Sequence, residues 1–298
     1  MISNSTRPIQ SPLRGIMLVL LACMLFACMD TAGKYLMSKF SVPLVATVRY
    51  GLHLIILTAL MAPRHGQTLW KTRRTGLVLL RGASLAIATL FAGLALQLMP
   101  VGETVAIFYL QGFGVMLAAG YFLGERMSLV GWTGAIAGFA GVLLIARPGS
   151  ALEPLGVVFA LTCAAVSVVY VLLSRVLSTT ESTMALLFYV GVAGVVVFGT
   201  MLSFHWQIYT YAWLDIALLG FMGAAALTAH FLFTAAYRYA PASLLAPFNY
   251  FHIALAVIMS WLVYSHVPDL SALIGMAMIA IAGATIALHM HVSKHKVS

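Results

Sequence analysis

The sequence predicts an all-α membrane protein with ten transmembrane helices, arranged as two inverted five-helix repeats around a central cavity. Composition is the first reason: 62% of the 298 residues are hydrophobic and only 8% are charged, which requires lipid rather than water as the main solvent. The second reason is internal repetition. Gly15 pairs with Gly156, and Tyr109 with Tyr250, at an offset of 141 residues that also separates Pro100 from Pro241.

Apolar runs long enough to cross a bilayer, roughly 17–25 residues, occur ten times. The predicted spans are 15–38, 43–62, 76–98, 103–123, 129–146, 155–177, 183–204, 213–239, 243–264 and 270–290. Connections are short, so we expect a single membrane domain over 1–298, with a first repeat at 15–146 and a second at 155–290. Because each repeat has an odd number of spans, the second enters the bilayer upside down.

The net charge of +9 is unevenly distributed. With the amino terminus in the cytoplasm, the outer side keeps only Lys34, Lys39 and Arg147, as the positive-inside rule requires. We therefore expect a bacterial inner (cell) membrane protein with both termini cytoplasmic. The cluster at 64–74 is expected to meet anionic lipid headgroups, and nucleic-acid binding is not expected. The inner-side residues are Arg7, Arg14, Arg64, Lys71, Arg73, Arg74, Arg126, Arg175, Arg238, Lys294 and Lys296.

Several segments resemble the EamA family of the drug/metabolite transporter superfamily. The segments are Asp30-Thr-Ala-Gly-Lys34, 49–51, 98–104, 121–126, 134–149, 240–247 and 275–283. The resemblance covers essentially the whole chain. It implies ten helices in two inverted repeats around a cavity, and transport of small metabolites, often amino acids and often outward. One position departs from the family pattern: the acid of the Gly-Glu turn at Glu125 is matched in the second repeat by His266.

Ionisable side chains within spans are costly in lipid and usually face the bundle interior. Asp30 and Lys34 share one helix face. They form either a self-neutralising pair or a binding element, in which Asp30 holds a substrate ammonium and Lys34 or Arg49 holds a carboxylate. Arg49 alternatively reaches the outer surface. His53, four residues further on, either hydrogen-bonds a neighbouring helix or carries a proton. Asp30 and His53 are the predicted coupling residues if protons drive transport.

The repeat offset also pairs Phe108 and Gln111 with Asn249 and His252. The two members of each set lie three residues apart and so share a helix face. We expect them on opposite walls of one cavity, where a ligand needs apolar bulk and a few polar groups. Ordinary hydrogen bonding between helices is the alternative interpretation.

Other positions are predicted to be structural. Glu103 is expected to cap a helix start, and Pro247 to kink its span. Glycines at 131, 134, 138 and 141 form a packing stripe. The cysteines Cys23, Cys28 and Cys163 are not expected to form disulfides. His289, His291 and His295 are assigned to a solvated tail, and no metal site is expected.

No phosphate-binding loop, metal-ligand spacing or paired nucleophile and base occurs. The sequence therefore predicts no enzyme and no cofactor. It predicts a secondary active transporter that works by alternating access on a small-molecule substrate. Export of amino acids or amino-acid-derived compounds is the main interpretation. The alternatives are multidrug or organic-cation efflux, and uptake of a metabolite such as riboflavin or S-adenosylmethionine. Proton coupling, facilitated diffusion and the oligomeric state stay open.

Overall fold

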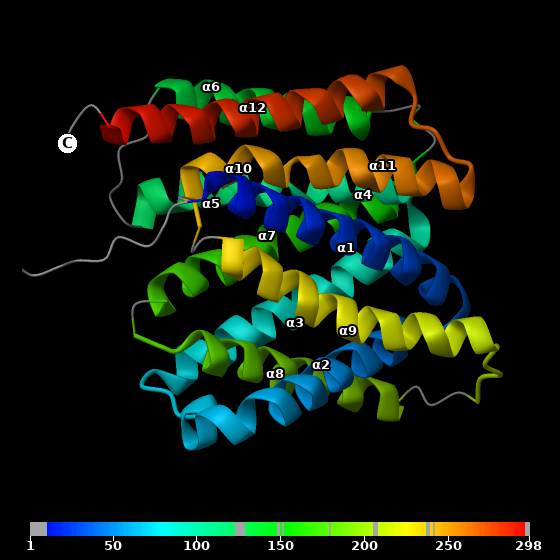
Figure 1. Ribbon diagram of the computed structural model, residues 1–298. Coiled ribbons are helices and arrows are strands. Elements are labelled where there is room, and N and C mark those ends of the chain that lie inside the picture. The colour runs from blue at the N-terminus through cyan, green and yellow to red at the C-terminus, as the bar shows by residue number, and fades with distance from the viewer. Residues whose placement is uncertain are drawn as a thin grey trace, which may run out of the picture.

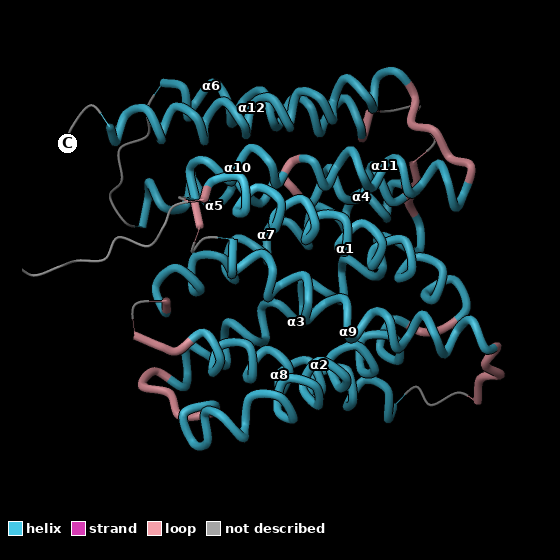
Figure 2. The backbone as a smooth tube through the Cα atoms, viewed as in Figure 1, coloured by secondary structure: helices cyan, strands magenta, loops and turns pink. Residues whose placement is uncertain are grey.

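The computed structural model describes residues 11–122, 129–147, 150, 152–178, 180–204, 208–236, 239–240 and 242–295. Within these residues every regular element is a helix (Figure 2), and nine spans are long and apolar enough to cross a bilayer. A shorter apolar helix, Leu129–Ile145, supplies the tenth. The prediction of an all-α membrane protein with ten spans is confirmed.

Two of the ten predicted spans are each divided into two helices, at 103–123 and 243–264. The first half contains α1 (Pro12–Lys39), α2 (Val42–His65), a 3-10 turn (Gly66–Leu69), α3 (Thr75–Leu98), α4 (Val101–Phe108), α5 (Leu110–Phe122) and α6 (Leu129–Ile145). The second half contains α7 (Pro154–Leu177), α8 (Thr183–Phe204), α9 (Trp213–Ala236), α10 (Ala242–Asn249), α11 (Phe251–Tyr264) and α12 (Leu270–His295). Helices α1, α2 and α7 have proline in their first two positions, where its missing N–H has no cost.

The first helix of each half packs mainly against helices of the other half. Helix α1 packs on α9, α10 and α11, which we call the α1 group, and α7 packs on α3, α4 and α5, the α7 group. The remaining helices pair across the halves at the two edges of the bundle: α6 with α12, and α2 with α8 (Figure 1). The two groups face each other across the middle of the molecule.

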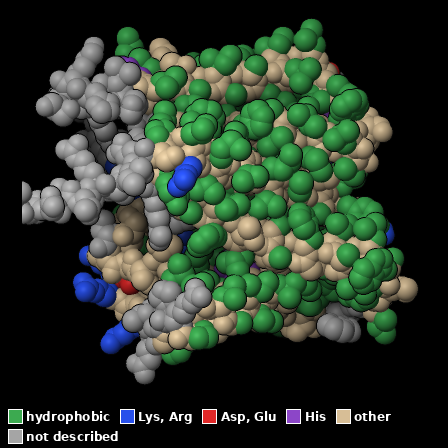
Figure 3. All heavy atoms as spheres, in the orientation of Figure 1, with side chains coloured by type: hydrophobic (Ala, Val, Ile, Leu, Met, Phe, Trp, Pro, Cys, Tyr) green, Lys and Arg blue, Asp and Glu red, His purple; other side chains and the backbone are tan. Residues whose placement is uncertain are grey.

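The first helix begins and the last helix ends at the same end of the bundle, on the left in Figure 1, here called the termini end. Apolar side chains cover most of the face in Figure 3, and most of its Lys and Arg side chains gather toward this left end. Four residues assigned to the inner side, Arg7, Arg126, Arg238 and Lys296, lie outside the described residues, as does Glu125. The side chains of Arg64, His291, Lys294 and His295 also lie outside the description.

The end opposite the termini, here called the far end, is joined by polar contacts between the two groups. His266 Nε2 lies 2.7 Å from Glu103 Oε1. Lys34 Nζ donates to the backbone carbonyls of Leu96 at 2.8 Å and Met99 at 2.7 Å. Ser265 ends α11 with a φ of 53°, and this left-handed residue turns the chain toward Glu103. The α1 and α7 groups are thus closed against each other at the far end.

These contacts correct one expectation. Glu103 does not cap α4, whose start at Pro100 has no side-chain cap. Instead its buried carboxylate pairs with His266, the residue that departs from the family pattern. A carboxylate in the first turn is favoured by the helix dipole, but the sequence could not show that a partner arrives from the second half.

The packing of Gly283 of α12 against Tyr250 gives a test of the fold. A Cβ at Gly283 would overlap the phenol ring of Tyr250, and overpacking typically costs about 1–3 kcal/mol. Gly283→Ala is therefore expected to lower the thermal unfolding midpoint in detergent. Gly220→Ala is the matched control because a Cβ there meets open space. Equal midpoints for the two variants would contradict this packing.

Candidate functional site: a cavity between two broken helices

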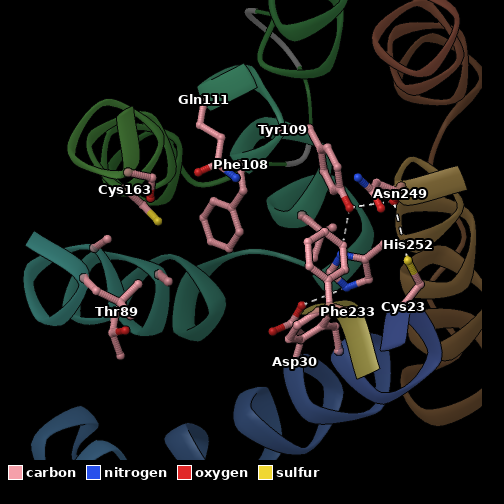
Figure 4. Close-up of a pocket in the computed structure, with 16 residues that line it drawn as sticks. Cys23, Asp30, Thr89, Phe108, Tyr109, Gln111, Cys163, Phe233, Asn249 and His252 are labelled. Atoms are coloured by element: carbon pink, nitrogen blue, oxygen red, sulfur yellow. Dashed lines mark hydrogen bonds and ion pairs between the residues drawn. The ribbon is translucent and has the colours of Figure 1, made fainter. Parts of the chain in front are cut away.

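A cavity of about 360 Å³ lies between the α1 group and the α7 group. Figure 4 shows its lining side chains converging from α1, α3, α5, α7, α9 and the two helix breaks. The lining combines aromatic rings, amides, hydroxyls and one carboxylate, Asp30. This mixture of apolar surface and few polar groups is typical of a small-molecule site.

Both broken helices are interrupted at the same repeat position. Tyr109 separates α4 from α5 with φ −65° and ψ −12°, and Tyr250 separates α10 from α11 with φ −66° and ψ −13°. The N–H of Tyr109 is shared between the Ala106 carbonyl at 3.2 Å and the Val105 carbonyl at 3.3 Å, and that of Tyr250 bonds the Pro247 carbonyl at 3.3 Å. These are tightened, 3-10-type turns. Discontinuous helices at matching positions of two repeats indicate the binding site in many transporters.

The predicted kink at Pro247 stays a prediction, because the interruption of the helix lies elsewhere. The break lies three residues later, at Tyr250, and its counterpart at Tyr109 has alanine, Ala106, where the second half has Pro247. Proline removes one hydrogen bond from α10, but the break in the first half forms without it. Because the two breaks share one backbone conformation, we attribute them to the repeat rather than to proline.

Side chains from one half bind backbone groups at the break in the other. Tyr109 Oη donates to the Asn249 carbonyl at 2.7 Å, and it lies 3.3 Å from His252 Nδ1. The tilted rings of Tyr109 and Tyr250 have centroids 5.1 Å apart. The side-chain Oδ1 of Asn249 is buried without a hydrogen-bond partner among the described residues. A buried acceptor of this kind is costly unless a ligand or water satisfies it.

Asp30 meets His252 across the cavity wall, as Figure 4 shows. Its Oδ2 lies 3.2 Å from His252 Nε2, a distance suited to an ion pair when the imidazole is protonated. The imidazole nitrogen is not directed at the carboxylate well enough to form a hydrogen bond, so the contact is electrostatic. The rings of Phe26 and Tyr109 flank the imidazole at 6.0 and 5.9 Å.

Five of the eight candidate site residues line the cavity, and three do not. The lining residues are Asp30, Phe108, Gln111, Asn249 and His252. Lys34 bonds backbone carbonyls at the far end, so the interpretation of an Asp30–Lys34 pair is wrong. Arg49 does not reach the outer surface: its Nη2 donates to Thr89 Oγ1 at 3.0 Å. His53 is buried against α8, where it bonds the carbonyl of Leu187.

The structure also identifies residues that sequence reasoning did not single out. Thr89 lines the cavity and joins it to Arg49. Arg81 of α3 is buried, and its guanidinium donates to Ser174 Oγ at 2.6 Å, the Leu186 carbonyl at 3.1 Å and Tyr170 Oη at 2.9 Å. The sequence could have pointed to Arg81, because it is the only charged residue in the predicted span 76–98.

Ten spans, two helix breaks at matching positions and a mixed central cavity define a membrane carrier of the repeat-built type. The EamA-like transporter family matches the chain twice, over residues 13–147 and 154–288. The chain therefore belongs to the EamA-like transporter family, and the resemblance seen in the sequence is confirmed.

Similar proteins are named as transporters. A riboflavin transporter of Vibrio cholerae is 25% identical over 286 residues, covering 92% of this chain and 93% of the relative. An S-adenosylmethionine uptake transporter of Rickettsia felis is 27% identical, covering 90% of each chain. A solved crystal structure aligns with a TM-score of 0.65 at 18% identity, over 93% of this chain and 96% of the other. That likeness shows the shared fold.

Proposed function

We propose that this protein is an uptake carrier of the bacterial inner membrane. Its substrate class joins a planar nitrogen heterocycle to a hydroxylated five-carbon sugar unit, which is an open ribityl chain in riboflavin and a ribose ring in S-adenosylmethionine. The names of the relatives support this interpretation better than the export of amino acids that the sequence suggested first. Two inverted repeats of five spans, at 15–146 and 155–290, are part of the proposal.

The lining of the cavity is the observation that carries the proposal. Rings of Phe26, Phe108 and Phe233 offer flat apolar surface on which a heterocycle stacks. The amides of Gln111 and Asn249 supply donors and acceptors for ring edges and hydroxyl groups. The unpaired Oδ1 of Asn249 gives a substrate N–H or O–H a buried acceptor.

Asp30 and His252 form the proposed coupling pair. In this proposal the carboxylate and the imidazole in contact share one proton, which either group can hold. Substrate arriving at Asp30 competes with His252 for the carboxylate. Binding of substrate and binding of a proton are thereby coupled at one site. His53, the other predicted coupling residue, does not line the cavity and is not needed for this step.

The proposed transport cycle moves the α1 group against the α7 group. Basic side chains gather at the termini end, which we assign to the cytoplasm. The closed far end then faces outward. Alternating access requires this closure to open and the termini end to close in turn.

An uptake assay tests the proposed function. Proteoliposomes containing the protein are expected to accumulate labelled riboflavin or S-adenosylmethionine with saturable kinetics, and an inward proton gradient should raise the initial rate. Empty liposomes and collapse of the gradient with a protonophore are the controls. Transport of amino acids with no uptake of either compound would instead support the export interpretation.

A further inference from the structure

The interior of the bundle holds two arginines that pair with no carboxylate in the described part of the chain. Arg81 is satisfied by a hydroxyl, a phenol and a carbonyl, all neutral. Arg49 has one hydrogen-bond partner among the described residues, Thr89, and its guanidinium lies 4.6 Å from the Tyr50 ring centroid. Arginine stays protonated in proteins, and a buried charge without a counter-charge is costly.

Thr89 places this positive charge directly behind the cavity wall. Thr89 lines the cavity, and its Oγ1 accepts from Arg49 while also bonding Tyr50 Oη at 2.7 Å. Arg49 therefore lies one hydrogen bond away from any ligand that touches Thr89. A stronger acceptor entering here would replace the neutral hydroxyl, because guanidinium binds oxyanions more tightly than hydroxyl groups.

Arg81 adds a second positive charge on this side. His53, one helical turn from Arg49, is buried with Nε2 unpaired among the described residues. Arg49, Arg81 and His53 all act electrostatically on His230 of α9. The ring of His230 lies 5.2 Å from that of Phe26, a residue of the cavity lining. The field of the two arginines thus reaches a residue that packs against the cavity lining.

The one carboxylate of the cavity lies on the other side. Figure 4 shows Thr89 and Asp30 on separate helices with the pocket between them. Asp30 is engaged with His252 of the α1 group, whereas Thr89 and its arginine neighbours belong to α2 and α3. The cavity therefore has a negative side at Asp30 and a positive side at Thr89.

We propose that the Thr89 side of the cavity binds an anionic group of the substrate, a carboxylate or a phosphate, with Arg49 as the specificity-determining cation. The inference rests on the proposed carrier function and narrows its substrate class to dipolar or anionic molecules. S-adenosylmethionine fits, since its carboxylate suits the Thr89 side and its cationic groups suit Asp30. Neutral riboflavin lacks the anionic group, whereas its phosphate ester, flavin mononucleotide, has one.

Two pairs of probes test this subsite with purified protein in detergent. S-adenosylmethionine is compared with its decarboxylated form, and flavin mononucleotide with riboflavin, so that each pair differs by one anionic group. In at least one pair, the anionic member is expected to bind the wild type about tenfold more tightly or better. Arg49→Gln should remove that preference by weakening the anionic member alone, and Arg49→Lys should keep part of it.

Arg147→Gln is the matched control, because Arg147 pairs with Asp269 at the far end and does not line the cavity. Thermal unfolding of each variant shows that it is folded. If the members of both pairs bind equally, or if Arg49→Gln weakens both members alike, the anionic subsite is wrong while the carrier function stands. If none of the four probes binds, the proposed substrate class fails and the subsite fails with it.

Discussion

Asp30→Asn is expected to lower substrate uptake about tenfold to a hundredfold, the effect of losing one charge-assisted contact in a buried site. Asparagine keeps the size of the side chain, so the helix packing of α1 should persist. It removes the charge that faces His252 at 3.2 Å and with it the proposed exchange of proton for substrate. Initial uptake rates in proteoliposomes between about pH 5.5 and 8, the range in which histidine titrates, measure the effect.

Asp269→Asn is the matched control for this carboxylate. Asp269 lies in the loop before α12, where the backbone N–H of Ala272 and the guanidinium of Arg147 lower the pKa of its carboxyl group. Asparagine caps helices as well as aspartate does, so little change is expected. Uptake by Asp30→Asn at the wild-type rate over the whole pH range would defeat the role assigned to Asp30.

Locking the far end is expected to stop transport almost completely. Glu103 and His266 belong to different halves and meet at 2.7 Å, at the closure that must open during the proposed cycle. In the double variant Glu103→Cys/His266→Cys, a short bifunctional thiosulfonate should reduce uptake to about a tenth or less, because it leaves a single conformation populated. A reducing agent should restore the original rate.

The native cysteines require attention in this experiment. Cys23 and Cys163 line the cavity, so they and Cys28 are first replaced by alanine, and uptake by that background is measured. The single variants Glu103→Cys and His266→Cys, treated with the same reagent, separate cross-linking from simple modification. Undiminished uptake by the cross-linked double variant would show that this end does not open.

The sequence predicted the spans closely because hydrophobic length is a local property. The spans expected at 155–177 and 183–204 appear as Pro154–Leu177 and Thr183–Phe204. The helix breaks were not predicted, although Tyr109 and Tyr250 were matched by the repeat offset. Both tyrosines keep an αR backbone, so each break is a slight tightening of a turn that no residue type signals.

Partners across the bundle were harder to predict than helix faces. Phe108, Gln111, Asn249 and His252 were expected to share a cavity, and all four line it. The expected partner of Asp30 was its helix neighbour Lys34, but the structure pairs it with His252 from the other half. Spacing along one helix shows which side chains share a face. It does not show which backbone carbonyl or imidazole of a neighbouring helix will lie within bonding distance of those side chains.

The exchange of partners between the halves has a consequence for the order of biosynthesis. Helix α1 leaves the ribosome before the other described helices, yet it packs on α9, α10 and α11, which are made much later. After synthesis of 1–147, α1 has met few of its final neighbours, while α3, α4 and α5 still lack α7. Neither group can be completed until the second half has been inserted. The carrier therefore assembles late, and a nascent chain halted after α6 would be left for quality control to remove.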